Sequence, residues 1–379
     1  MKRILLLTVF GVSLLVAGSV RADNDLFGFL RHRVVGAVFT MDNSPDGNNV
    51  WAFGRKADGT LTEPAVYPTQ GTGTGGGLGN QGAVQLSDDG RWLFVCNAGS
   101  DDISVFLVTP RGLYLTDKAS SEGQQPISIA LSGPLVYVLN AGGAVSGADS
   151  ITGFVFFRGR LWHLPGASYS LSDDNTGPAD IAFTKDGQNI VVTEKGTGLI
   201  DTFQVGRYGL VEGFQSYLSP VPTPFGFATG RHDRIYVTEA NGGAANPGGS
   251  SVSSYQVAAD GGLSIISESV PTFQTAACWL ALSHDERFAY TANTPDDSIS
   301  SFYVHRNGSL ELLQSQAGLT GTGSGPVDMS FSNNGRFLYS LNAGNGTIGA
   351  FLVNRRTGAL TALAGASDLP ATVNGLAAR

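Results

Sequence analysis

An internal repeat of about fifty residues constrains the fold of this chain more than any other feature. The stretch 90–99, which contains Asn97-Ala98-Gly99, returns in closely similar form as residues 335–344. An aromatic residue closes the third apolar run of every unit, at Phe53, Phe106, Phe154, Phe203, Tyr255, Phe302 and Phe351. The intervals between these residues are 53, 48, 49, 52, 47 and 49. Seven units of this period are typical of a β-propeller.

Each unit is expected to form four strands, a to d, in one antiparallel sheet. Polar turns at 87–90, 184–187 and 332–335 end in Asp-Gly or Asn-Gly, which favour the twist of a hairpin between strands a and b. Strand b is apolar on both faces, as in residues 92–95, and strand c alternates, as in residues 299–304. The Gly content, 52 of 379 residues, agrees with many short strands and tight turns.

The two ends of the repeat region complement each other. Residues 34–39 form a strand b with no strand a before it, and residues 372–378 form a strand a with nothing after it. The sequence therefore predicts an all-β fold over residues 34–379, a seven-bladed β-propeller with four antiparallel strands per blade. The C-terminal strand should complete the first blade and so hide the sheet edges. The alternative, an open solenoid, would leave both ends unpaired.

The N-terminus has the pattern of a secretory signal peptide over residues 1–22, followed by a lead over residues 23–33. Lys2 and Arg3 give the positive start, residues 4–17 are apolar, and small residues before the boundary place cleavage after Ala22. A transmembrane anchor is the alternative, but the apolar run is short for a span. We expect a periplasmic or extracellular protein with no membrane insertion after cleavage.

Charge and cysteine content narrow the function classes. The net charge of −8 argues against nucleic acid as a partner. Cys96 and Cys278 lie far apart in the repeat order, so they are expected to be buried free thiols, with a disulfide as the alternative.

Strand direction divides the loops between two faces of the ring. The b–c loops and d–a connections share the loop face, which has long insertions at 69–80, 141–149, 241–251 and 319–325. Its b–c loops are acidic, with Lys195 as their one basic residue, whereas most arginines lie on the turn face formed by the a–b and c–d turns. The loop face should favour a neutral or cationic ligand or a metal ion, unless these carboxylates are only solvated loop charge. No cofactor or resident metal is predicted.

One position at the end of strand b supplies the candidate site residues. It holds an amide in four units and a carboxylate in two: Asn97, Asn140, Asn293, Asn342, Glu194 and Glu239. These side chains are expected either to hydrogen-bond loop amides or to contact substrate. Glu194 could act as a general base, and Asp180, in strand a of the same unit, could shift its pKa. His232 and His284 fall in a–b turns, so no histidine base is expected on the loop face.

Residues 177–183, with Asp186-Gly187 and Glu194, resemble a blade of the lactonase family of seven-bladed propellers. This family includes 6-phosphogluconolactonase and carboxy-muconate lactonizing enzyme, and it is related to propellers with Tyr-Val-Thr-Asn repeats. The resemblance implies lactone chemistry and an Arg-His pair where this chain has Ala179-Asp180. A second family histidine falls at Ile127 or Ser128, and a further arginine falls near Cys278. Only Glu194 matches, so the resemblance makes a phosphorylated substrate doubtful.

Two hypotheses of different classes follow. The first is a lactonase-like hydrolase acting on a neutral lactone at the channel mouth, with Glu194 and Asp180 as catalytic residues and Asn97, Asn140, Glu239, Asn293 and Asn342 binding substrate. The second is a non-catalytic propeller that binds a protein, glycan or small ligand on its acidic loop face. We expect a monomer in either case.

Overall fold

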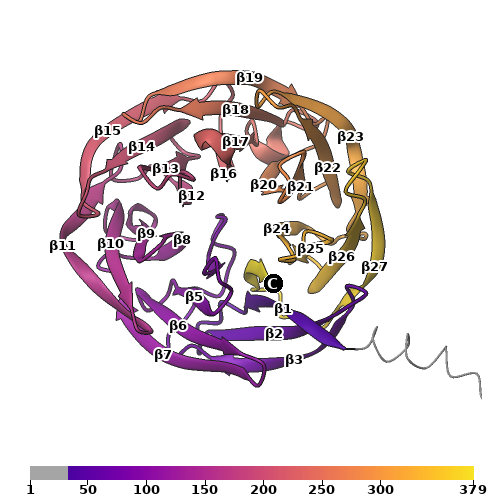
Figure 1. Ribbon diagram of the computed structural model, residues 1–379, viewed down its shortest axis with the longest axis horizontal. Coiled ribbons are helices and arrows are strands. Elements are labelled where there is room, and N and C mark those ends of the chain that lie inside the picture. The colour runs from indigo at the N-terminus through magenta and orange to yellow at the C-terminus, as the bar shows by residue number, and fades with distance from the viewer. Residues whose placement is uncertain (1–32) are drawn as a thin grey trace, which may run out of the picture.

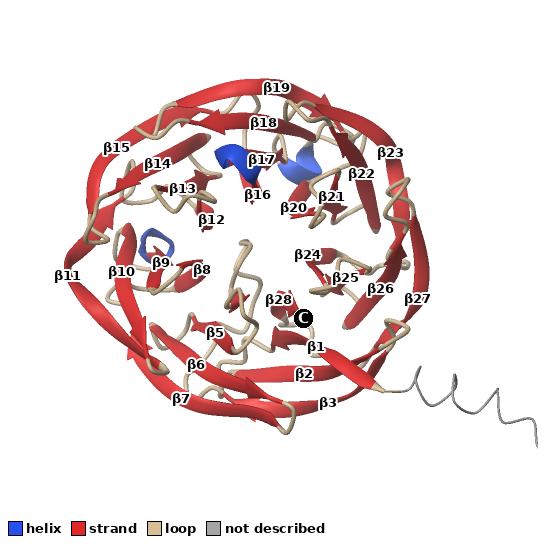
Figure 2. Ribbon diagram, viewed as in Figure 1, coloured by secondary structure: helices blue, strands red, loops and turns tan. Residues whose placement is uncertain are grey.

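The computed structural model describes residues 33–379 as a ring of seven four-stranded antiparallel sheets around a central channel (Figures 1 and 2). The predicted signal peptide and nearly all of the predicted lead lie outside the described residues. Within residues 33–379, no helix has the length and apolar character needed to cross a membrane. The predicted all-β, seven-bladed fold is confirmed.

The blades are numbered in chain order, and the strands of each blade are given from the channel outward. Blade 1 contains β28 (Asn374–Ala378), β1 (Val34–Met41), β2 (Asn49–Lys56) and β3 (Leu61–Pro68). Blade 2 contains β4 (Val84–Leu86), β5 (Trp92–Asn97), β6 (Asp102–Thr109) and β7 (Gly112–Ser120). Blade 3 contains β8 (Pro126–Ser132), β9 (Leu135–Ala141), β10 (Asp149–Phe157) and β11 (Arg160–Ser170). Blade 4 contains β12 (Pro178–Phe183), β13 (Asn189–Glu194), β14 (Leu199–Val205) and β15 (Val211–Leu218).

The remaining blades repeat this order. Blade 5 contains β16 (Pro224–Gly230), β17 (Arg234–Glu239), β18 (Ser251–Val257) and β19 (Leu263–Pro271). Blade 6 contains β20 (Ala277–Leu282), β21 (Phe288–Asn293), β22 (Ser298–Val304) and β23 (Leu310–Leu319). Blade 7 contains β24 (Pro326–Phe331), β25 (Phe337–Asn342), β26 (Thr347–Val353) and β27 (Leu360–Ala366). Three short 3₁₀ helices lie in connections: η1 (Gly142–Ala144), η2 (Arg231–Asp233) and η3 (Gly243–Ala245).

The C-terminal strand closes the ring, as predicted. Strand β28 pairs antiparallel with β1, with Val38 opposite Ala378 and Thr40 opposite Leu376. Backbone hydrogen bonds between Ala37 and Arg379 extend this pairing by one residue. Blade 1 therefore contains both ends of the repeat region, and no blade depends on a partner chain to complete its sheet.

Burial decreases from the channel side to the rim, which explains the strand patterns in the sequence. Strand β13 is buried at every residue because blade neighbours cover both of its faces, whereas the outermost strand β15 alternates between half-buried and exposed residues. The a–b turns end at glycines such as Gly90, with φ +64°, and Gly335, with φ +63°. This left-handed backbone is strained for other residues, so the Asp-Gly and Asn-Gly signals have a geometric cause.

Tyrosine hydroxyls join successive blades. Three strand-b tyrosines each donate a hydrogen bond to the carbonyl of the c–d turn glycine in the next blade: Tyr137 to Gly209 at 2.6 Å, Tyr290 to Gly358 at 2.7 Å and Tyr339 to Gly59 at 2.8 Å. All three tyrosines are among the largest fully buried side chains. These bonds satisfy buried polar groups and fix the contact between adjacent blades.

The Gly-rich insertion before β4 crosses the central channel (Figure 1). Its Gln81 side chain donates to the carbonyls of Phe227 and Leu280, at 2.9 and 3.3 Å, and accepts from the Leu280 backbone at 2.9 Å. The backbone of Asn80 accepts a hydrogen bond from the Trp279 indole at 2.7 Å. The insertion thus uses backbone groups of blades 5 and 6 as partners and fills the loop-face end of the channel.

Candidate functional site

The six candidate residues at the end of strand b occupy equivalent positions, as the sequence indicated, but they are all fully buried. The Asn97 amide donates to the Ser104 hydroxyl at 2.8 Å, and the Asn293 amide donates to Ser300 at 2.9 Å. Asn140 and Asn342 donate in the same way to strand-c threonine hydroxyls. Most partners are therefore side chains of strand c rather than the loop amides that we expected. Substrate contact by these residues stays a prediction.

Glu239 follows the same pattern with a carboxylate. Its oxygens accept hydrogen bonds from Ser219 at 3.3 Å, Ser251 at 2.5 Å and Ser253 at 2.6 Å. Burial raises the pKa of Glu239, and the three hydroxyls only partly oppose that effect. Ser251 and Ser253 lie on strand c of blade 5 and Ser219 lies in the connection from blade 4, so strand c and this connection together hold the carboxylate.

Glu194 is 0% exposed and is held by the connection from blade 3 and by the b–c loop of its own blade. Its carboxylate accepts from the Ser172 backbone at 3.0 Å, the Ser172 hydroxyl at 2.5 Å and the Thr197 hydroxyl at 2.5 Å. Burial and the adjacent Glu194 carboxyl raise the pKa of Asp201, on β14, to about 8. The carboxyl partner of Glu194 is therefore Asp201. The sequence could not show this pairing, because it depends on the cross-strand register of β13 and β14.

Asp180 lies on the innermost strand, where its side chain joins three blades. It accepts from the Ser128 hydroxyl of blade 3 at 3.1 Å, from its own blade through Ile181 N at 2.9 Å, and from Phe227 N of blade 5 at 3.1 Å. The residue is 3% exposed. Burial raises the pKa of Asp180 to about 7, against the effect of these hydrogen bonds. The protonation of Asp180 is thus set by burial and not by Glu194.

Asp328 is a second channel carboxyl that the sequence analysis missed. It accepts from Met329 N at 2.7 Å and from Leu376 N of blade 1 at 2.8 Å, so it joins blades 7 and 1 as Asp180 joins blades 4 and 5. Burial raises the pKa of Asp328 to about 8, and the charge of Asp180 contributes. A signal was present, because Gly325-Pro326-Val327-Asp328 repeats Gly177-Pro178-Ala179-Asp180.

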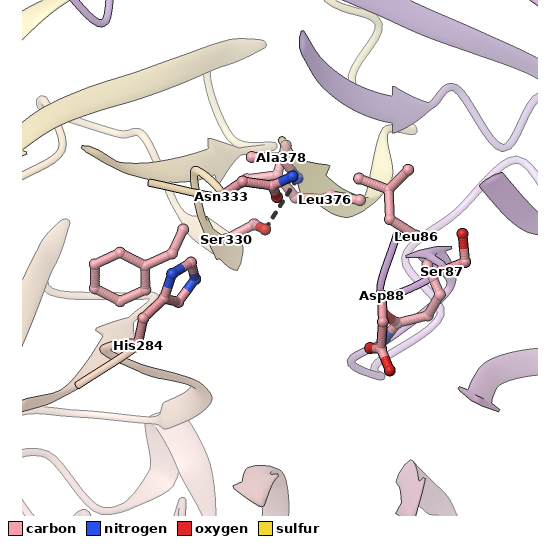
Figure 3. A pocket seen from close by; sticks show the side chains of 11 residues that line it. Leu86, Ser87, Asp88, His284, Ser330, Asn333, Leu376 and Ala378 are labelled. Carbon is pink, nitrogen blue, oxygen red and sulfur yellow. Dashed lines mark hydrogen bonds between the residues drawn. The ribbon is translucent and has the colours of Figure 1, made fainter. Parts of the chain in front are cut away.

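Two adjoining cavities open at the turn-face mouth of the channel; together they are called the channel cavity. One, of about 480 Å³, is lined by Ser87, Asp88, Ser330 and Asn333, and the other, of about 410 Å³, by Gln81, Asp180, Lys185 and Glu286; Gln85 and His284 line both. Figure 3 shows His284 on one side of the first cavity and Ser87 and Asp88 on the opposite side. We expected a site among the long loops of the other face, where the insertion at residues 80–81 instead crosses the channel.

His284 is the residue in the channel cavity whose role sequence reasoning missed. It was expected at the surface in an a–b turn, and the residue is partly exposed there. The turn, however, lies at the channel mouth, where the His284 ring packs against Phe331 with centroids 5.9 Å apart. Partial burial of the ring lowers the pKa of His284, and the nearby positive charges of Arg355 and Lys185 act in the same direction. A neutral imidazole can accept a proton at neutral pH.

Comparison with known proteins agrees with this architecture. The family model described as "Lactonase, 7-bladed beta-propeller" matches residues 47–144, 214–326 and 250–375. Among curated proteins no significant match was found.

Among solved structures, the periplasmic gluconolactonase of Pseudomonas aeruginosa is similar at a TM-score of 0.71 and 18% identity, covering 90% of this chain and 98% of that one. A protein from Lactobacillus plantarum is similar at a TM-score of 0.70 and 15% identity, with 91% and 100% of the two chains covered. A proposed 6-phosphogluconolactonase of Bacteroides fragilis has a TM-score of 0.66 and 19% identity, with 91% and 98% covered. These likenesses show the fold. Because the family model matches more than half of the chain, the chain belongs to the lactonase family of seven-bladed β-propellers.

Proposed function

We propose that this protein is a lactonase-like hydrolase that opens an uncharged lactone in the channel cavity. The observation that carries the proposal is the channel cavity itself, which brings a histidine with a lowered pKa, a carboxyl with a pKa of about 7 and several amide donors together in a member of the lactonase family. Groups that titrate near neutrality are those that acid–base catalysis requires.

The chemistry needs three contributions from the protein. A water must lose a proton as it attacks the lactone carbonyl, and neutral His284 can accept that proton. The carbonyl oxygen gains negative charge, which the Lys185 ammonium or the Gln85 amide can stabilise. The ring oxygen must take a proton when the acyl C–O bond breaks, and the protonated form of Asp180 can supply it. The product is a hydroxy acid.

The charge of the channel cavity supports an uncharged substrate. Asp88 and Glu286 line it together with a single lysine, Lys185, and Asp180 adds a negative charge when it is ionised. A ligand that carries phosphate or carboxylate would meet more negative than positive groups there. This agrees with the absence of the family's Arg-His pair at Ala179-Asp180.

Hydrolysis of a panel of uncharged and anionic lactones tests the proposal. Wild type should prefer the uncharged members, and His284→Gln and Asp180→Asn should each lower kcat by roughly 10²-fold or more. Circular dichroism and the melting temperature would show that each variant is folded. The proposed roles also predict a bell-shaped pH profile, with activity lost above about pH 7 as Asp180 ionises.

Glu194→Gln is the matched comparison, because Glu194 was the catalytic candidate from sequence. The geometry favours unchanged kcat in this variant, since Glu194 is fully buried within blade 4. A collapse of turnover in a folded Glu194→Gln protein would instead assign catalysis to Glu194. No turnover above buffer by folded wild type would remove the lactonase proposal for that panel.

A second candidate is a non-catalytic propeller that binds a ligand on its loop face. The observation in its favour is that Glu194, Glu239 and Asp180 all engage their oxygens with hydroxyls or backbone N–H groups of the fold. Such contacts stabilise the blades without any substrate. Saturable ligand binding by a protein that hydrolyses no lactone would support this candidate.

We also propose that the chain is exported, because residues 1–22 have the charge, apolar run and cleavage site of a signal peptide. N-terminal sequencing of protein recovered from a periplasmic or secreted fraction should begin at Asp23. An intact N-terminus at Met1 would contradict the proposal.

A further inference from the structure

A further cavity lies between blades 5 and 6 on the turn face, and Glu286 lines both it and the channel cavity. It has a volume of about 510 Å³ and is formed by η2, the start of β17, the a–b turn of blade 6 and the end of β22 with the turn that follows. Its charged and aromatic lining consists of Arg231, His232, Arg234, Tyr236, Asp285, Glu286, Arg287, Tyr303, His305 and Arg306. We call it the arginine cleft. The lactonase proposal gives the arginines of this cleft no role.

The arginine cleft carries unbalanced positive charge. Four arginines line it with two carboxylates. Glu286 pairs with Arg231, at 3.7 Å from its Nε, and Asp285 pairs with Arg287 at 3.2 Å. Residues 33–379 contain two further ion pairs, and neither Arg234 nor Arg306 takes part in any of the four. Two guanidinium charges in the cleft therefore lack a carboxylate partner, in a chain whose net charge is −8.

The Arg234 side chain is held in place, but one of its N–H donors has no hydrogen-bond partner among the described residues. Its Nη1 donates to the backbone carbonyl of Arg306 at 2.8 Å, which fixes the guanidinium across the blade boundary. Its Nε is buried and has no hydrogen-bond partner among the described residues. A buried charge without an opposite charge beside it costs free energy, and an anion in the cleft lowers that cost.

Arg234 also differs in character from the residues at the same position in other blades. In blades 3, 6 and 7, the strand-b tyrosine approaches the c–d turn glycine of the next blade. At the boundary between blades 5 and 6 the corresponding glycine is Gly308, and a Cβ atom there would lie 2.6 Å from Arg234 Cδ. The equivalent glycines of blades 4, 7 and 1 meet the first strand-b residue of the preceding blade in the same way, and there it is Leu135, Phe288 or Phe337. Arg234 thus places a charged side chain where those blades have an apolar one.

We propose that the arginine cleft binds phosphate, either free or as a phosphomonoester. Guanidinium groups present paired N–H donors that match the oxygens of phosphate, and they stay charged at every physiological pH. A phosphate group carries nearly two negative charges at pH 7, which balances the two unpaired arginines. Arg306 offers exposed N–H donors to such a ligand, and Arg234 adds a positive charge from the buried side of the cleft.

Isothermal titration of folded, full-length protein with inorganic phosphate at low ionic strength tests this proposal. Wild type should bind one equivalent, and Arg306→Ala should weaken affinity roughly tenfold or more, as expected for loss of a charge-assisted hydrogen bond. Arg306 is an exposed turn residue, so its removal should leave the fold intact. Arg356→Ala is the matched control, because Arg356 is an exposed arginine in the c–d turn of blade 7, outside the cleft.

Three outcomes would overturn the proposal: no saturable heat when wild type is titrated with phosphate, equal weakening of binding by Arg306→Ala and Arg356→Ala, or binding of acetate as tight as that of phosphate at equal ionic strength. Phenyl phosphate identifies the source: tighter binding than phosphate indicates a phosphomonoester, and weaker binding indicates the free ion. Lactone hydrolysis by wild type and Arg306→Ala should be equal, so failure of this proposal is distinguishable from failure of the lactonase proposal.

Discussion

Replacing Asp201 by Asn should remove a pH-dependent part of the folding stability. Asp201 is fully buried, and burial together with the Glu194 carboxyl raises its pKa to about 8. Its Oδ1 accepts from the Ser216 hydroxyl at 2.5 Å, whereas its Oδ2 is buried without a partner among the described residues. A proton on Oδ2 would let the acid donate to Glu194. The side-chain amide introduced by Asp201→Asn would provide a similar donor at every pH.

The size of this pH-dependent stability difference follows from the protonation of Asp201 in the folded and unfolded states. The folded-state pKa of about 8 lies above the ordinary value of 3.8, so between these limits the folded protein holds a proton that the unfolded chain has lost. The stabilisation is complete below about pH 4 and declines as pH rises toward 8. The slope is about 1.4 kcal/mol per pH unit. Relative to Asp201→Asn, wild type should therefore lose about 3 kcal/mol between pH 5 and pH 7.

Urea unfolding followed by tryptophan fluorescence, at intervals from pH 5 to pH 8, measures this difference. Asp297→Asn is the control, because the pKa of Asp297 is shifted in the opposite direction to that of Asp201. Burial tends to raise the pKa of Asp297, but hydrogen bonds from the backbone of Gly325 and Gly323 outweigh it and lower the pKa. Its contribution is present above the ordinary value and lost only in acid, so its gap from wild type should stay constant over this range. Parallel pH curves for wild type and Asp201→Asn would refute the reasoning.

Two further changes test contacts between blades. Tyr290→Phe removes the hydroxyl that donates to Gly358 and should lower the unfolding free energy by about 1 kcal/mol. Tyr303→Phe, whose hydroxyl has no hydrogen bond within residues 33–379, should be nearly neutral in the same urea experiment, and equal losses would contradict the account. Gln81→Ala removes three hydrogen bonds across the channel and should cost about 2–3 kcal/mol. A melting temperature unchanged by Gln81→Ala would show that the insertion does not support the ring.

The fold could be predicted because the aromatic position recurs in all seven units and several units add a local turn signal. The Asp-Gly and Asn-Gly turns mark positive-φ positions such as Gly90, and the isolated strands at the two ends matched the pairing of β28 with β1. Cys96 and Cys278 were expected to be free and buried, and they are. In each case the chemistry of a few neighbouring residues determines the outcome.

The candidate site was harder to predict from the sequence because it depends on contacts between different blades. Glu194 and Asp180 lie in one blade. Glu194 accepts hydrogen bonds from the connection after blade 3 and lies beside Asp201 of β14, whereas Asp180 accepts hydrogen bonds from blades 3 and 5. The position of His284 at the channel mouth follows from ring closure and from the insertion that crosses the other end. The sequence assigned His284 correctly to an a–b turn but did not show that this turn borders a cavity.

The most direct test of the account is a crystal structure with the lactam analogue of the best uncharged lactone substrate. The account predicts ligand density in the channel cavity, with the carbonyl near Gln85 or Lys185 and the ring between His284 and Asp180. Density on the loop face, beside the loops that follow Glu194 and Glu239, with an empty channel cavity, would contradict it.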